Sequence, residues 1–134
     1  MTTGISTYAL KKIQDNWFGA AGNSVPGTFY AALFVAGSEV ANSNNYSRVA
    51  ITNNATNFPP GTSANPSIIL NGTLVQFATP SGSWGTPDNV RFFDSGTYGA
   101  GNEHAKATIG TPAAIGTNDD VHFAIGALSF SLGS

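Results

Sequence analysis

The sequence predicts a mainly β protein, an antiparallel β-sandwich or barrel of about eight short strands that follows one N-terminal helix. Short apolar runs alternate with turn segments rich in Gly, Pro, Asn and Ser from residue 27 onward. The most continuous apolar run, 27–37, has apolar side chains on both strand faces, which predicts a strand covered on both sides. Apolar residues at helical spacing precede this region, so the helix is expected at the N-terminus.

The N-terminal segment is expected to form a short mobile arm at residues 1–5 and then a helix over residues 6–18. A Ser-Thr pair can cap the start of this helix, and Gly19 can end it. We expect its apolar stripe either to dock on the β core or to pack on a neighbouring subunit. The residues of this stripe are Leu10, Ile13, Trp17 and Phe18.

The β core is expected over residues 27–134. Asn71 and Gly72 separate two apolar runs, which predicts a hairpin between them. The polar run 103–109 predicts a sheet edge, and long loops are expected at 53–66 and 95–102. The predicted strands cover residues 27–37, 46–52, 68–70, 74–78, 90–94, 103–109, 121–125 and 128–132.

Four residues are expected to have structural roles. Leu33 and Phe92 lie on apolar strand faces, and Trp84 is expected to fill or cap the core. Arg48 lies in an otherwise apolar strand, where an unpaired buried charge is very costly. We therefore expect Arg48 to pair with a carboxylate or with backbone carbonyls. The alternative is an arginine whose stem lies on the sheet while its guanidinium reaches water.

The composition points to one domain of 134 residues with a weakly charged surface. Charged residues make up 9% of the chain, against about 25% in typical domains, which suits a protein that packs against neighbours. The net charge of −2 predicts no nucleic-acid partner, and the absence of cysteine excludes disulfides. No apolar run reaches membrane-spanning length, and no signal peptide is expected, so we expect no membrane partner and assembly in a cytoplasm.

No catalytic, cofactor or metal site is expected, and we predict that the protein is not an enzyme. His122 follows Asp119 and Asp120, but this spacing is more typical of a turn than of a metal site. No nucleophile elbow or phosphate loop is present in the sequence. Several aromatic residues could instead stack on sugar rings, so a carbohydrate-binding module is an outside alternative. These residues are Tyr46, Phe58, Trp84 and Tyr98.

Five stretches together resemble small virion structural proteins of tailed bacteriophages, which are labelled head decoration (cement) proteins or tail fibre proteins. The chain departs from that pattern after the central strand, where Ala36 to Val40 replaces an Asp-Pro-Gly turn. It departs again where Tyr98 to His104 replaces a Gly-Gly-Asn-Leu-Leu stretch. The resemblance implies no catalytic residue. The stretches are Tyr8 to Gly19, Gly27 to Phe34, Tyr46 to Ile51, Ser83 to Asp94 and Gly116 to Gly133.

Within that class, a capsid decoration protein that stabilises the head is the main expectation, because the short chain shows no coiled coil or fibrous repeat. A small tail fibre or tail-tip protein is the alternative. The resemblance implies a virion location, with the major capsid protein and copies of the chain itself, most often in a trimer, as partners. The candidate interface residues are Thr2, Thr3, Ile5, Trp17, Phe58 and Tyr98.

Overall fold

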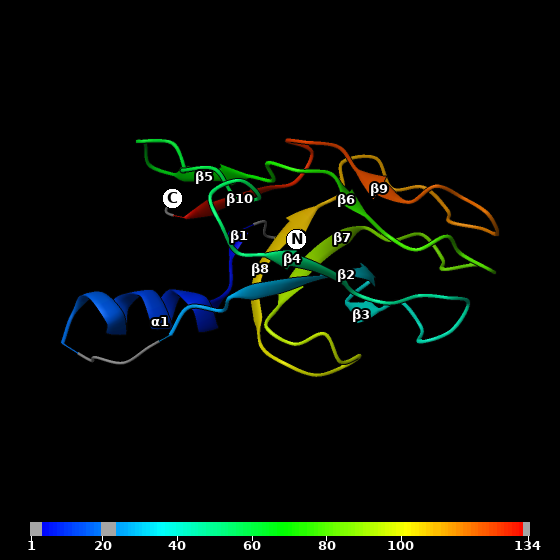
Figure 1. The fold of residues 1–134 in the computed structure, drawn as a ribbon, viewed down its shortest axis with the longest axis horizontal. Helices are drawn as coiled ribbons and strands as arrows, with labels where there is room; N and C mark the ends of the chain where they lie inside the picture. The colour runs from blue at the N-terminus through cyan, green and yellow to red at the C-terminus, as the bar shows by residue number, and fades with distance from the viewer. Residues whose placement is uncertain (1–3, 20–23, 133–134) are drawn as a thin grey trace.

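The computed structural model describes residues 4–19 and 24–132, which form open antiparallel β-sheets with one N-terminal helix, α1 (Figure 1). The largest sheet has six strands in the order β1-β8-β7-β2-β3, and β4 also pairs with β2. None of the described sheets closes into a barrel. The sheets are open, so the barrel alternative is wrong. The strands of this sheet are β1 (Gly4–Ile5), β2 (Thr28–Val35), β3 (Ser38–Glu39), β4 (Val49–Thr52), β7 (Asn89–Phe93) and β8 (Glu103–Thr108).

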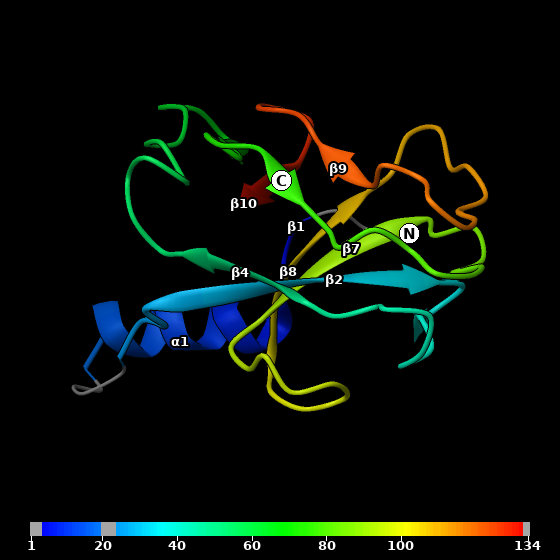
Figure 2. The ribbon, with the colours of Figure 1, turned by 45° about the vertical axis from the view of Figure 1, so that its right-hand side comes forward.

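Two small sheets lie over one face of the large sheet, above it in both views (Figure 2). One pairs β5 (Ser67–Leu70) with β10 (Ser129–Leu132), and the other pairs β6 (Val75–Gln76) with β9 (His122–Phe123). The loop at 95–102, yellow in the figures, lies on the opposite face of the large sheet. The core therefore forms between the large sheet and the two small ones.

Strand β2 is the centre of the large sheet and is buried on both faces, as its sequence predicts. Ala31 and Leu33 are fully buried in the core together with Phe92 of β7. Ala32 and Phe34 point to the other face and are also buried. No second sheet covers that other face in the described part of the chain. Two arginine side chains and the loop at 95–102 cover it instead.

Helix α1 spans Thr7–Trp17, close to the predicted range. The Ser6 side chain caps its start by accepting a hydrogen bond of 3.1 Å from the Ala9 backbone N–H. At its end, the Phe18 N–H donates to Gln14 O, and Gly19 adopts a positive φ of 89° that glycine tolerates without strain. No helix in the described residues is long and apolar enough to cross a lipid bilayer.

The predicted hairpin at Asn71 and Gly72 is wrong. Strand β5 pairs with β10 and β6 pairs with β9, so the two runs beside this dipeptide do not pair with each other. The buried Asn71 side chain accepts a hydrogen bond of 2.9 Å from Leu128 N and donates one of 3.0 Å to Ala124 O. Asn71 therefore holds the turn between β9 and β10, because its amide can satisfy both backbone groups at once.

The predicted sheet edge and the predicted arm are both corrected by strand β1. Gly4 pairs with Lys106 and Ile5 with Ala105, so β8 has β7 on one side and β1 on the other. Only residues 1–3 of the arm lie outside the described residues. Gly4 has a φ of 143°, and a Cβ there would lie 2.6 Å from Ser131 O, so this strand approaches β10 closely only because position 4 is glycine.

The remaining differences concern strand limits. The predicted strand 46–52 is shorter, because only residues 49–52 pair with β2, while Tyr46 reaches across to the core. The other seven predicted strands appear with shifts of one or a few residues at their ends. The structure adds β1 and β3, two-residue strands whose length gives no periodic signal in a sequence. It therefore shows ten strands in the described residues.

Candidate functional site

A buried ion pair between Arg48 and Glu39 fastens the outer face of the large sheet. The Arg48 Nε donates to Glu39 Oε2 at 3.0 Å, and Nη2 donates to Glu39 Oε1 at 2.8 Å. The side chains are only 2% and 7% exposed. This bidentate geometry satisfies both charges, which a buried pair requires. Arg48 therefore has a carboxylate partner, as expected from the sequence, and its guanidinium does not reach water as in the alternative.

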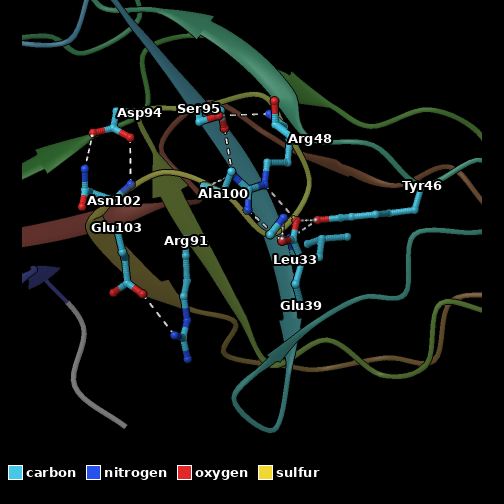
Figure 3. A network of polar contacts seen from close by, with 12 residues as sticks. Leu33, Glu39, Tyr46, Arg48, Arg91, Asp94, Ser95, Ala100, Asn102 and Glu103 are labelled. Carbon is cyan, nitrogen blue, oxygen red and sulfur yellow. Dashed lines mark hydrogen bonds and ion pairs between the residues drawn. The ribbon is translucent and has the colours of Figure 1, made fainter.

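The same arginine holds the loop at 95–102 onto the sheet. Its Nη1 donates to Ser95 O at 2.7 Å and to Ala100 O at 2.8 Å, so one guanidinium binds both ends of the loop (Figure 3). The Gly99 N–H donates to Glu39 Oε1 at 3.4 Å. The sequence left a carboxylate or backbone carbonyls as the partner of Arg48, and the structure shows that Arg48 binds both kinds of group. The loop is anchored at three points to one buried ion pair.

Tyr46 links this ion pair to the core. Its hydroxyl donates to Glu39 Oε2 at 2.9 Å and accepts from the Leu33 N–H at 3.0 Å (Figure 3). Burial raises the pKa of Tyr46 far above its usual value, and the neighbouring Glu39 carboxylate raises it further. Tyr46 therefore stays protonated at neutral pH and keeps its donor role there.

Two stacked phenylalanine rings, each covered by an arginine, continue across the same face. The Arg48 Cζ lies 4.1 Å from the Phe93 ring centroid, and the Arg91 Cζ lies 4.1 Å from that of Phe34. The two rings are stacked with centroids 5.9 Å apart. Arg91 in turn binds Glu103 at 3.0 Å. Each guanidinium thus covers an aromatic face, which explains how this side of β2 is buried without a second sheet.

The base of the loop is closed by Asp94. Its carboxylate accepts from the Asn102 N–H at 2.8 Å and lies 3.1 Å from His104 Nε2. Burial alone raises the pKa of Asp94, but the hydrogen bonds from Asn102 and His104 outweigh it, so that this pKa lies below its usual value. His104 also contacts the helix, because its ring meets Tyr8 edge-on with centroids 5.2 Å apart. Asp94 thus joins the loop to the base of α1.

An apolar groove of about 920 Å³ opens beside α1. Its walls come from the helix, the start of β2 and the strand pair β5–β10. Four phenylalanines line its inner end with edge-to-face contacts between centroids 4.8 to 6.2 Å apart. Apolar side chains make up most of the lining, and polar or charged residues such as Lys12, Asp94 and His104 also take part in it. The four rings are Phe29, Phe58, Phe92 and Phe130.

The apolar stripe of α1 does not dock on the β core, which corrects the first of the two sequence expectations for it. Ala9 is the buried residue of the helix, and it faces the sheet. Leu10 and Ile13 are about two-fifths exposed, and Trp17 and Phe18 are 78% exposed. At about 100° per residue, the stripe lies roughly 75° around the helix from Ala9. The helix therefore contacts the sheet through Ala9 and lines the groove with Ile13, but it leaves most of its apolar stripe, above all Trp17, uncovered.

The candidate interface residues are not gathered at one place. Thr2 and Thr3 lie outside the described residues, and Ile5 is half-buried in β1. Phe58 is half-buried at the groove, and Trp17 is exposed on α1. Tyr98 is 39% exposed on the anchored loop. The exposed members therefore mark two separate surfaces, the helix and the loop.

The residues expected to be structural lie in or beside the core. Leu33, Trp84 and Phe92 belong to the buried cluster. The Trp84 indole N–H donates to Asn44 O at 2.9 Å. Because Trp84 and Tyr46 are buried, the aromatic set suggested for sugar binding is not available at the surface. This argues against the carbohydrate-binding alternative.

Sequence reasoning missed Glu39 and Asp94. Glu39 was the one carboxylate between Asp15 and Asp88, so it was the nearest acidic partner in sequence for Arg48. Phe34 and Phe93 lie at the alternate positions of their two strands, on the second apolar face that the sequence predicts for β2.

No arrangement for catalysis or metal binding stands out in the described residues, where no cluster of three or more metal-ligating side chains occurs. The exposed pair of His122 Nδ1 and Asp120 Oδ2 lies at 3.2 Å. Hydrogen bonds from Gln76 and His122 lower the pKa of Asp120. The Asp120 side chain accepts from Gln76 at 2.9 Å as part of the turn before β9. This pair has the features of a surface turn.

Comparison with known proteins gives one family. The model of a family described as podophage GP4 fiber I protein gp80 matches residues 4–131, from β1 almost to the end of β10. No curated protein matches the chain. Of the two labels that the sequence resemblance left open, the match supports the tail fibre label over capsid decoration.

Proposed function

Because the chain belongs to this podophage fiber I protein family, and so to the structural fibre proteins of phages, we propose that it is a non-enzymatic subunit of a tail fibre. The match over residues 4–131 carries the proposal. It replaces the expectation of a capsid decoration protein. That expectation relied on the absence of elongating repeats, but a small domain can also extend a fibre when copies associate.

The anchored loop supports a structural role. A fibre subunit must hold its surface shape while neighbours bind it, because ordering a mobile loop at binding would cost free energy. Arg48 holds both ends of the 95–102 loop, and Asp94 closes its base. Tyr98 is thereby presented at a fixed position, with its ring 6.3 Å from that of Tyr46.

The partners we propose are other tail or fibre components and further copies of the chain, in a cyclic homo-oligomer for which a trimer is the first choice. Charged residues make up only 9% of the chain, so close polar and apolar contacts carry little desolvation cost. We propose that the chain acts as one domain, since β1 connects its N-terminal part to β8 and lies against β10. Many weak contacts in such an assembly gain strength through multivalency.

Cryo-electron microscopy of whole virions tests this function. We expect density that fits this fold on the tail, in the fibres. A chain-specific antibody fragment, applied to virions, should decorate the same place and thereby identify the chain independently of map resolution. Density or decoration restricted to the head shell would refute the fibre assignment and leave the fold unchanged.

A further inference from the structure

The apolar stripe of α1 is largely exposed in the described residues. Leu10, Ile13 and Trp17 form one continuous apolar strip, and Phe18 extends it at the end of the helix. Helical surfaces of this kind are rarely left in water unless they are interaction sites. The helix contacts its own sheet through Ala9, and the described residues leave most of the stripe uncovered.

We propose that this stripe packs on the same stripe of other copies of the chain, so that the α1 helices associate around the axis of a homo-oligomer. The inference rests on the proposed function, because it assigns the contact between copies in the fibre. The spacing of three and then four residues from Leu10 to Ile13 to Trp17 is the heptad spacing by which identical helices pack side by side.

The charge distribution favours a copy of the same helix as the occupant. Lys11 and Asp15 lie on the far side of the helix from the stripe and form an ion pair with each other. The flanking positions Gln14 and Asn16 are polar and uncharged. Identical helices can therefore approach along this face without like-charge repulsion, and polar side chains remain to form the rim of the interface.

The size of the stripe predicts a modest contact. Two aromatic side chains can bury on the order of 300 Å² or more, and a standard interface buries about 800 Å² per partner. The stripe alone therefore supplies only part of an interface. An 11-residue helix is also too short to be stable by itself, so the contact has to form in the folded chain. We expect association that rises with protein concentration, with Trp17 as its largest contributor.

Site-specific crosslinking tests this contact in the full chain. The sequence contains no cysteine, so a single introduced thiol reports one position only. Leu10→Cys places the thiol on the stripe, and Lys11→Cys places it on the far side of the same helix as a matched control. With a short bis-maleimide, which joins two thiols, Leu10→Cys should give covalent dimers and Lys11→Cys at least tenfold less.

Adding Trp17→Asp to the Leu10→Cys chain should lower the crosslinked yield at least tenfold. Because Trp17 is 78% exposed, the fold should survive, and an unchanged circular dichroism spectrum checks this. Equal yields for the two thiols, or a yield that Trp17→Asp does not change, would overturn the proposal. A chain that stays monomeric in solution while its Leu10→Cys thiol is protected in virions would also overturn it, and would indicate a different virion protein as the occupant.

The outcome is separable from that of the proposed function. If virion imaging places the chain in the fibres but the stripe does not crosslink, only the contact between copies is wrong. If the stripe crosslinks but imaging places the chain on the head, only the fibre assignment is wrong.

Discussion

The loop at 95–102 and helix α1 both lie outside the packed sheets, yet they are held in opposite ways. Two hydrogen bonds donated by Arg48 and one accepted by Glu39 fix the backbone of the loop. The helix contacts the sheet through Ala9, and its apolar stripe is exposed to water. The loop forms its polar contacts within a single chain, whereas an exposed apolar helix face is typical of a surface that is buried in an assembly.

The buried ion pair is where a single substitution should have its largest effect. Arg48→Met leaves the Glu39 carboxylate buried without its charge partner, which should lower the free energy of unfolding by about 3–5 kcal/mol. Urea denaturation followed by fluorescence measures it. The double variant with Glu39→Gln should be less destabilised than the single one, since no charge is then left unpaired. A loss below about 0.5 kcal/mol for Arg48→Met, the usual range for surface sites, would show that the pair is unimportant.

A smaller effect is expected where the loop packs on the sheet. A Cβ at Gly96 would lie 2.8 Å from Cε1 of the Tyr30 ring, so Gly96→Ala must push the loop or the ring aside. We expect a loss of about 1–3 kcal/mol, as for other overpacked sites. Gly99→Ala serves as the control for steric overlap, because no atom lies within 4 Å of a Cβ at that position. Its positive φ of 72° adds backbone strain of its own. Equal stability of Gly96→Ala and wild type would mean that the loop does not pack as described.

Asp94 should make the loop sensitive to acid. Its pKa is lowered from 3.8 in the folded chain, so its contribution to stability is fully present above pH 3.8 and is lost as the pH falls through the lower folded-state pKa. The stability difference between wild type and Asp94→Asn should therefore be constant near neutral pH and shrink below pH 3.8. Thermal unfolding at a series of pH values measures it. A difference that stays constant down to pH 2 would contradict the lowered pKa.

The smallest effect on stability is expected on the helix. Trp17→Asp should change the free energy of unfolding by no more than about 0.5 kcal/mol, because the side chain is 78% exposed. The same urea titration, run at low protein concentration to keep the chain monomeric, measures it. A loss of several kcal/mol would mean that Trp17 belongs to the core of its own chain, and the contrast between loop and helix would fail.

Local pattern in the sequence determined the strands and the helix. The side chains around Leu33 alternate between two apolar faces, and this pattern can be seen in the sequence without knowing what covers each face. In the structure β2 is buried on both faces. A cap at Ser6 and a stop at Gly19 depend on neighbours within one turn, so α1 was predicted nearly to the residue. An arginine within an apolar strand predicted a partner for Arg48, although not its identity.

Only the tertiary structure decided which segments meet. The dipeptide of Asn71 and Gly72 is a local turn signal, but the strands beside it pair with strands far away in the sequence. Strand pairing depends on non-local contacts, which a dipeptide does not contain. In the same way, the stripe on α1 was visible from its spacing, but periodicity shows only that a face is apolar and not what covers it. That face is uncovered because Ala9, small enough to approach the sheet closely, set the rotation of the helix.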